Sequence, residues 1–99
     1  MSEVQIVLWR DIPAQVKARH GRERAALSLS PRFQEAIDAA AMRAGLYETD
    51  DYLGEWRASA WEEAVGSPEE AVEKHAAEIE GDYSDERLRL LVDRGGKES

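Results

Sequence analysis

Four basic side chains that lie close together in the sequence are the residues of this chain best suited to chemistry. They are Lys17, Arg19, Arg22 and Arg24, and they surround Gly21. Guanidinium and ammonium groups bind phosphates and carboxylates, and arginine can do so through two parallel hydrogen bonds. Alternation along a strand puts positions 17 and 19 on one face, and a reversal at the glycine brings position 22 or 24 beside them. The spacing therefore predicts a site for a phosphate, a nucleotide or a carboxylate.

The same cations have a second interpretation that needs no ligand. Charged side chains on an edge strand discourage pairing with other chains, and natural sheets use them for this purpose. They can also pair with the acidic helices that are expected later in the chain. The sequence leaves the ligand site and the protective role as alternatives.

Trp9, Arg10 and Asp11 stand just before a proline, in a segment typical of a turn. Arg10 is a fifth candidate for anion or partner binding, or it pairs with a helix carboxylate such as Asp38. Asp11 is expected to accept backbone N–H groups and so hold the turn. Trp9 and Trp61 are candidate interface residues, because tryptophan is a preferred anchor in protein interfaces. Packing inside the chain itself is the alternative for both tryptophans.

Patterns typical of catalysis or metal binding do not occur in the sequence. The chain has no cysteine, which excludes disulfides, thiolate metal sites and cysteine nucleophiles. It has two histidines, and a surface pair is a far commoner explanation than a shared metal for His75 and Glu78 on one expected helix. Nucleophile-elbow, phosphate-loop and zinc-protease motifs are missing too. We therefore predict no metal, no cofactor and no catalytic residues, and the balance is against an enzyme.

The charge of the chain is unevenly distributed. Residues 1–43 hold seven Lys/Arg against five Asp/Glu, whereas residues 44–99 hold six against sixteen. The net charge of −8 opposes nucleic-acid binding, which depends on neutralising phosphates. Two halves of different charge can orient a protein partner through electrostatic attraction. The alternative is that the acidic half consists of helices whose charged faces are simply exposed to solvent. The N-terminal apolar run is too short for a signal peptide or a membrane span, so a cytoplasmic protein is expected.

The elements that position these residues are strands first and helices afterwards. Alternating apolar and polar residues predict three strands within residues 4–29. Four helices are expected to follow: one from Ser30-Pro31 to Gly45, one between Thr49 or Asp50 and Gly66 with the stripe Leu53, Trp56, Ala60 and Ala64, one opened by the capping box Ser67-Pro68-Glu69-Glu70, and one after Ser84. The fold class is α+β, an N-terminal three-stranded antiparallel sheet followed by four helices, the first two packed on the sheet. Residues 1–94 form a single domain and 95–99 a flexible tail.

The stretch Trp9-Arg10-Asp11-Ile12-Pro13-Ala14-Gln15-Val16 is the most specific motif of the chain. Together with the stretches at residues 32–38, 41–46 and 51–57, it resembles a small bacterial family catalogued as "virulence factor". The resemblance covers about residues 4–57, and residues 58–99 carry no matching motif, which suggests a lineage-specific extension. It assigns no catalytic residues. Members of this family accompany folate- and corrinoid-linked one-carbon enzymes, so the resemblance implies an accessory protein for such a system.

These observations favour a non-enzymatic accessory or docking protein. The alternative is a small-anion or nucleotide-binding module that uses the basic strand–turn–strand at residues 17–24. A protein partner is expected, whereas nucleic acid and membrane are not expected to bind.

Overall fold

The sheet has five antiparallel strands, and β1 lies in its middle. The computed structural model describes residues 1–46 and 48–98. Its strands are β1 (Ser2–Trp9), β2 (Ile12–His20), β3 (Glu23–Ser28), β4 (Trp56–Ala58) and β5 (Glu62–Ala64). They are arranged in the order β3-β2-β1-β4, and β5 pairs with β1 on the same side as β4. The three strands that the sequence predicts form the expected meander, and Gly21 turns from β2 to β3 with a φ of 59°.

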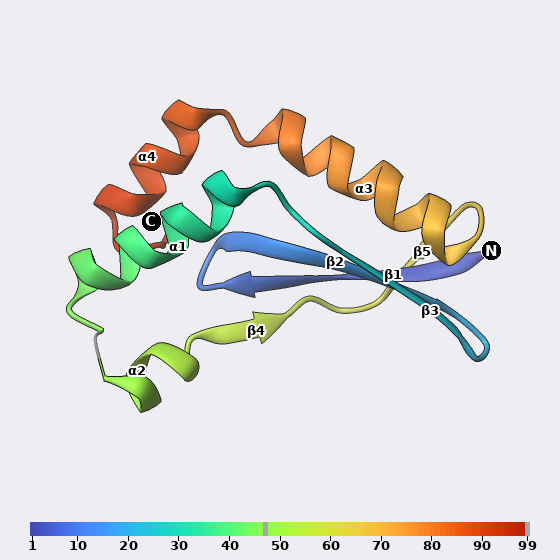
Figure 1. The fold of residues 1–99 in the computed structure, drawn as a ribbon, viewed down its shortest axis with the longest axis horizontal. Coiled ribbons are helices and arrows are strands. Elements are labelled where there is room, and N and C mark those ends of the chain that lie inside the picture. Colours follow the sequence, from blue (N-terminus) through green and yellow to red (C-terminus); the bar gives the residue numbers. More distant parts are fainter. Residues whose placement is uncertain (47, 99) are drawn as a thin grey trace.

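The longer helices all lie on one side of the sheet (Figure 1). The helices are α1 (Pro31–Ala44), α2 (Thr49–Leu53), α3 (Pro68–Asp82) and α4 (Asp85–Asp93). α1 packs on β2, α3 packs across β1, β2 and β3, and α4 packs on α1. In the part of the chain that the structure describes, no helix covers the opposite face of the sheet between β3 and β1 (Figure 1). None of the described helices combines the length and the apolar character that a membrane-spanning helix requires.

The second helix that the sequence predicts is much shorter in the structure. α2 ends at Leu53, and the rest of the expected helix forms β4, β5 and the connection between them. The cause is the second edge of β1, whose backbone groups need partners. Ser59 supplies two of them, since its N–H donates to the Ile6 carbonyl and its hydroxyl accepts from the Ile6 N–H, both at 2.9 Å. The sheet therefore has five strands instead of three, and α3, not the second helix, joins α1 on it.

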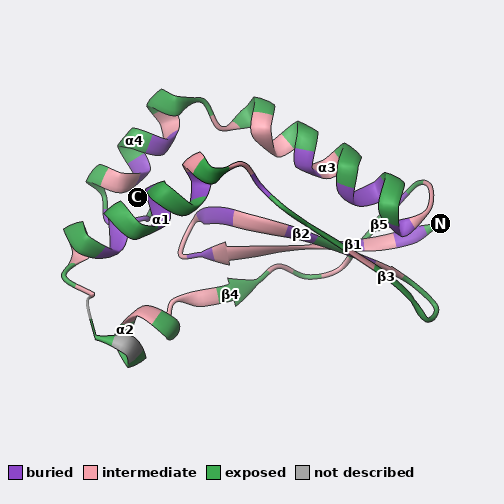
Figure 2. Cartoon of the chain, viewed as in Figure 1, coloured by how far each residue is buried: buried purple, intermediate pink, exposed green. Residues whose placement is uncertain are grey.

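The core lies between the sheet and the helices, and the sheet contributes buried residues to it mainly from β1 and β2 (Figure 2). Val4 on β1 is buried opposite Ala18 on β2. The pairing register shifts between Val7 and Leu8, where Ala14 is the extra residue of a bulge on β2. Trp9, not Leu8, is completely buried, which corrects the simple alternation that the sequence suggests.

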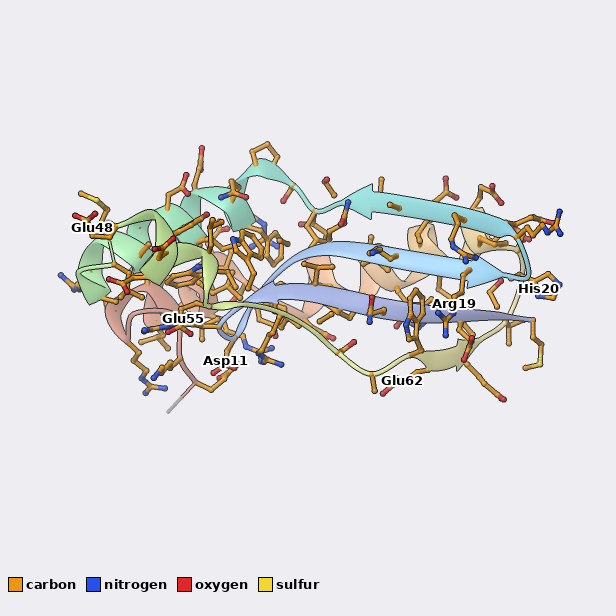
Figure 3. The ribbon with its side chains drawn as sticks, turned by 90° about the horizontal axis from the view of Figure 1, so that it is seen from below. Asp11, Arg19, His20, Glu48, Glu55 and Glu62 are labelled. Carbon is orange, nitrogen blue, oxygen red and sulfur yellow. The ribbon has the colours of Figure 1, made fainter. Side chains whose placement is uncertain are left out.

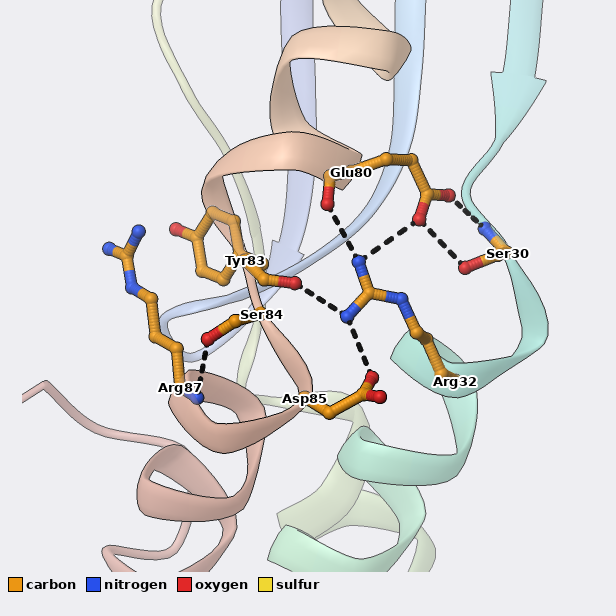
Figure 4. A network of polar contacts seen from close by, with 7 residues as sticks. All are labelled: Ser30, Arg32, Glu80, Tyr83, Ser84, Asp85 and Arg87. Carbon is orange, nitrogen blue, oxygen red and sulfur yellow. Dashed lines mark hydrogen bonds and ion pairs between the residues drawn. The ribbon is translucent and has the colours of Figure 1, made fainter.

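A polar network fixes the start of α1 against the end of α3 (Figure 4). The sequence predicts that the Ser30 side chain caps α1, but this hydrogen bond is not formed. Instead, the Glu80 carboxylate accepts from the Ser30 N–H at 2.6 Å and from the Ser30 hydroxyl at 2.9 Å. Arg32 donates to the carbonyl oxygens of Glu80 and Tyr83, and pairs with the carboxylates of Glu80 and Asp85. Partial burial raises the pKa of Glu80, but the hydrogen bonds from Ser30 and the Arg32 charge outweigh it and lower the pKa below its usual value.

The predicted caps of the two C-terminal helices are confirmed. Ser67 and Glu70 form the reciprocal capping box of α3, and the hydrogen bond from the Ser67 N–H lowers the pKa of the Glu70 carboxyl. The Ser84 hydroxyl accepts from the Arg87 N–H at the start of α4. Gly45 ends α1 with a φ of 75°, as expected for a left-handed C-terminal residue.

Candidate functional site

The β2–β3 hairpin places three of the candidate cations on the sheet face that carries no helix. Val16 and Ala18 of β2 are buried toward the helices. The alternate residues Lys17 and Arg19 therefore point to the opposite side of the sheet, which we call the open face. Arg24 of β3 is the cross-strand partner of Arg19 and therefore shares that face. Figure 3 looks onto this face, with Arg19 near the hairpin end of β2. The alternation in the sequence is enough to predict this arrangement.

A depression of about 380 Å³ lies beside these cations. Its lining residues are Lys17, Ala18, Arg24, Ala25, Ala26 and Trp61. Trp61 comes from the connection between β4 and β5, on the other side of β1, and reaches the hairpin strands across the open face. Small alanine side chains on β3 leave space next to the indole ring. Lys17 and Arg24 are both exposed, so a ligand in the depression meets two cations and an aromatic ring.

Arg19 holds Trp61 in this position and is itself partly neutralised. Its guanidinium carbon lies 3.9 Å from the centroid of the Trp61 ring, within the range of a cation–π contact. Its Nε donates to the Glu3 carboxylate at 3.1 Å. Arg19 therefore acts on the indole ring and on β1, and Lys17 and Arg24 remain the better candidates for contact with an anion.

The two arginines of the turn differ in their contacts. Arg24 donates from Nη1 to the carbonyl oxygens of Gly21 and Glu23, at 2.8 and 3.2 Å. These bonds keep its guanidinium at the end of the hairpin. Arg22 is exposed, and it makes no ion pair with any residue that the structure describes.

Arg10 does not join the basic hairpin, because it lies at the opposite end of β2. It donates to the Gly95 carbonyl at 3.0 Å and pairs with the Glu55 carboxylate at 3.1 Å, so Glu55 and not Asp38 is its partner. The Arg10 side chain is only 13% exposed, and its guanidinium carbon lies 5.3 Å from the centre of the Trp9 ring. Its contacts are those of a structural residue.

Trp9 is also unsuited to the interface role that the sequence allows for it. The side chain is completely buried, stacks on Tyr52 with 5.6 Å between ring centroids, and donates from its indole N–H to the Tyr52 carbonyl. A side chain without exposed surface cannot anchor a partner on the folded chain. Packing inside the chain, the alternative reading of Trp9, is what the structure has.

The segment after α4 lies against the turn that Arg10 and Asp11 form. The Asp11 N–H donates to the Gly96 carbonyl, and the Asp11 carboxylate accepts from the Glu98 N–H and from Arg57. Asp11 thus accepts a backbone N–H, as expected of a turn carboxylate, but from a distant segment. Gly95 and Gly96 are both buried. The sequence predicts a flexible tail over residues 95–99, and no signal in it points to these contacts; Ser99 lies outside the described residues.

A second depression, of about 390 Å³, lies further along the open face. Trp56, Val7, Gln15 and Ser28 are among its lining residues. The sequence predicts Trp56 on the apolar stripe of a helix, and therefore gives no indication of this site. Its polar groups are neutral amides and hydroxyls, which suits an apolar or uncharged polar ligand group.

Residues 7–92 match the family model described as "Virulence factor". The chain belongs to this family. No curated protein and no solved structure matches the chain in the same comparisons. The match includes α3 and most of α4, so the suggestion that a lineage-specific extension begins at residue 58 is wrong. The motif Trp9–Val16, which carries the resemblance, lies inside the matched segment. Its first three residues are Trp9, Arg10 and Asp11, whose contacts at the β1–β2 turn are described above.

In the described part of this virulence-factor family member, no group of three or more histidine, aspartate or glutamate side chains is arranged to hold a metal ion. The His75 Nδ1 atom lies 3.0 Å from the Ala71 carbonyl oxygen, one helical turn earlier. The basic hairpin, Trp61 and the adjoining depression are therefore the candidate site of this family member.

Proposed function

We propose that this chain is a non-enzymatic accessory protein that docks on another protein through the open face of its sheet. One observation carries the proposal: Trp61, Lys17 and Arg24 line a depression on the only broad face of the described sheet that no helix covers. A half-buried tryptophan beside exposed cations is typical of interface anchors, since it combines apolar area with polar contacts at its rim. The family resemblance implies a link to folate- and corrinoid-linked one-carbon enzymes. These enzymes are therefore the first partners to test.

Site-specific photo-crosslinking in living bacteria tests this function. A photoreactive amino acid replaces Ala26, which is exposed on the open face, or Ala77, which is exposed on α3 and serves as the matched control. We expect one predominant protein to be crosslinked in stoichiometric amounts from position 26 and not from position 77. Absence of a product at position 26, or the same products from both positions, would contradict docking by this face.

The second candidate function is a small-anion or nucleotide-binding module. It is supported by the same depression, because Lys17 and Arg24 line its wall directly and leave polar nitrogen atoms for a phosphate. Thermal unfolding with inorganic phosphate, nucleotides and folates separates the two functions. A rise in Tm that Lys17→Ala and Arg24→Ala abolish, and that Arg89→Ala on α4 retains, would favour the anion site.

A further inference from the structure

β3 is the long free edge of the sheet. It has six residues, five of which are exposed, and it pairs on one side with β2. No described strand pairs with its other side. Figure 3 shows it as the outermost strand, with nothing beyond it in the plane of the sheet. The outward N–H and C=O groups of such a strand are open to pairing with another chain.

The opposite edge of the sheet is protected in ways that β3 is not. There β1 is covered by β4 and β5, each three residues long, and Glu62 and Glu63 bring charge to β5. Short strands and charges are the usual means of blocking an edge. β3 contains no proline, and its register with β2 is unbroken from Gln15–Ser28 to His20–Glu23. Its charges stand only at the hairpin end, and residues 25–28 are uncharged.

The side chains beside this edge favour an acidic occupant. Arg24 on β3 and Lys17 on β2 project from the open face, and both are exposed. In an added strand, alternate side chains lie on that same face, next to Arg24, Ala26 and Ser28. A carboxylate there reaches the two cations, and a larger apolar side chain fits over the small Ala26 toward Trp61. A second copy of this chain is less suitable, because each copy carries a net charge of −8.

We propose that the docking partner binds by strand addition: an extended acidic segment of another protein pairs with the outer edge of β3. This inference rests on the proposed docking function and specifies how the docking occurs. Main-chain hydrogen bonds to β3 supply affinity, and the cations and the Trp61 depression select the side chains.

The experiment uses the whole chain, labelled with ¹⁵N, and a synthetic peptide. The peptide has eight residues that alternate valine with glutamate and has blocked ends; its control replaces each glutamate with lysine. In the free chain we expect alternate amides of residues 23–28 to exchange rapidly with solvent, because they point away from β2. With saturating acidic peptide their exchange slows at least tenfold. Lys17→Glu with Arg24→Glu weakens binding by about tenfold or more, since each cross-strand charge pair contributes up to about 1 kcal/mol.

Arg89→Glu, a charge reversal at an exposed position on α4, is the matched control and leaves the affinity unchanged. Equal binding of the lysine peptide, binding without slower exchange in β3, or no binding would each overturn strand addition. A concentration-dependent dimer that protects the same amides would replace the acidic segment with a second copy. These outcomes are distinct from failure of the docking function, in which position 26 yields no partner in the cell.

Discussion

The guanidinium group of Arg19 stacks on the ring of Trp61 and at the same time pairs with Glu3. Three segments far apart in the sequence thus meet at one arginine: the first strand, the hairpin and the β4–β5 connection. The contact decides where the Trp61 ring stands relative to the depression. It also explains why a cation on the open face contributes to the site without itself being the best contact for an anion.

Removal of the Arg19–Trp61 contact should slightly lower the stability of the fold and leave the Trp61 ring free to move. We expect Arg19→Ala to lower the free energy of unfolding by about 1 kcal/mol, because its side chain is 37% exposed and solvent screens its interactions. Trp61→Ala should cost a similar amount, and the double variant less than the two together. Denaturant unfolding of all three measures the coupling. Arg22→Ala should change stability by less than about 0.5 kcal/mol, and a purely additive double variant would argue against the stack.

The packing of the C-terminal glycines on the turn is tested by adding one methyl group. A Cβ at Gly96 would stand 2.9 Å from Cζ3 of Trp9, at a residue whose φ is 94°. Gly96→Ala should therefore lower the free energy of unfolding by about 2–4 kcal/mol. Gly21→Ala is the control, since it has a φ of 59° but no atom near the added methyl; it should cost about 1 kcal/mol. Equal losses for the two variants would mean that the segment does not pack on Trp9 and is flexible.

The parts of the structure that the sequence predicts are those encoded by neighbouring residues. The β2–β3 hairpin follows from alternation and one glycine, and the capping box at Ser67 follows from four consecutive residues. The same alternation places Lys17, Arg19 and Arg24 on one face. Each of these predictions depends on residues that are close in the sequence. At such short range, the spacing of two residues determines directly whether their side chains point to the same side.

The parts that it does not predict depend on distant partners. Ser59 joins β1 because Ile6 has unpaired backbone groups there, and nothing near Ser59 indicates a strand of three residues. Apolar residues such as Trp56 and Ala60 fit a helical stripe equally well, so periodicity alone gave the wrong element. Gly95 and Gly96 look like a flexible end, yet their lack of side chains is what lets them approach Trp9.

Acid should weaken the junction between α1 and α3 through Glu80. Its pKa is lower in the folded chain than the ordinary glutamate value of 4.5, so its ionised form stabilises the fold above that pH. This contribution declines as the pH falls from about 4.5 through the folded pKa. At pH 7, Glu80→Gln should reduce the free energy of unfolding by about 1–2 kcal/mol, because the amide offers a weaker acceptor to Ser30 and no charge to Arg32.

Denaturant unfolding between pH 7 and pH 3 provides the measurement. The difference between the wild-type chain and Glu80→Gln should shrink as the pH falls, since the protonated carboxyl and the amide are then alike in charge. Glu78→Gln, a change at an exposed position on the same helix, should follow the wild-type profile. A Glu80→Gln difference that stays constant down to pH 3 would show that the contribution of the Ser30 and Arg32 bonds does not depend on the charge of Glu80.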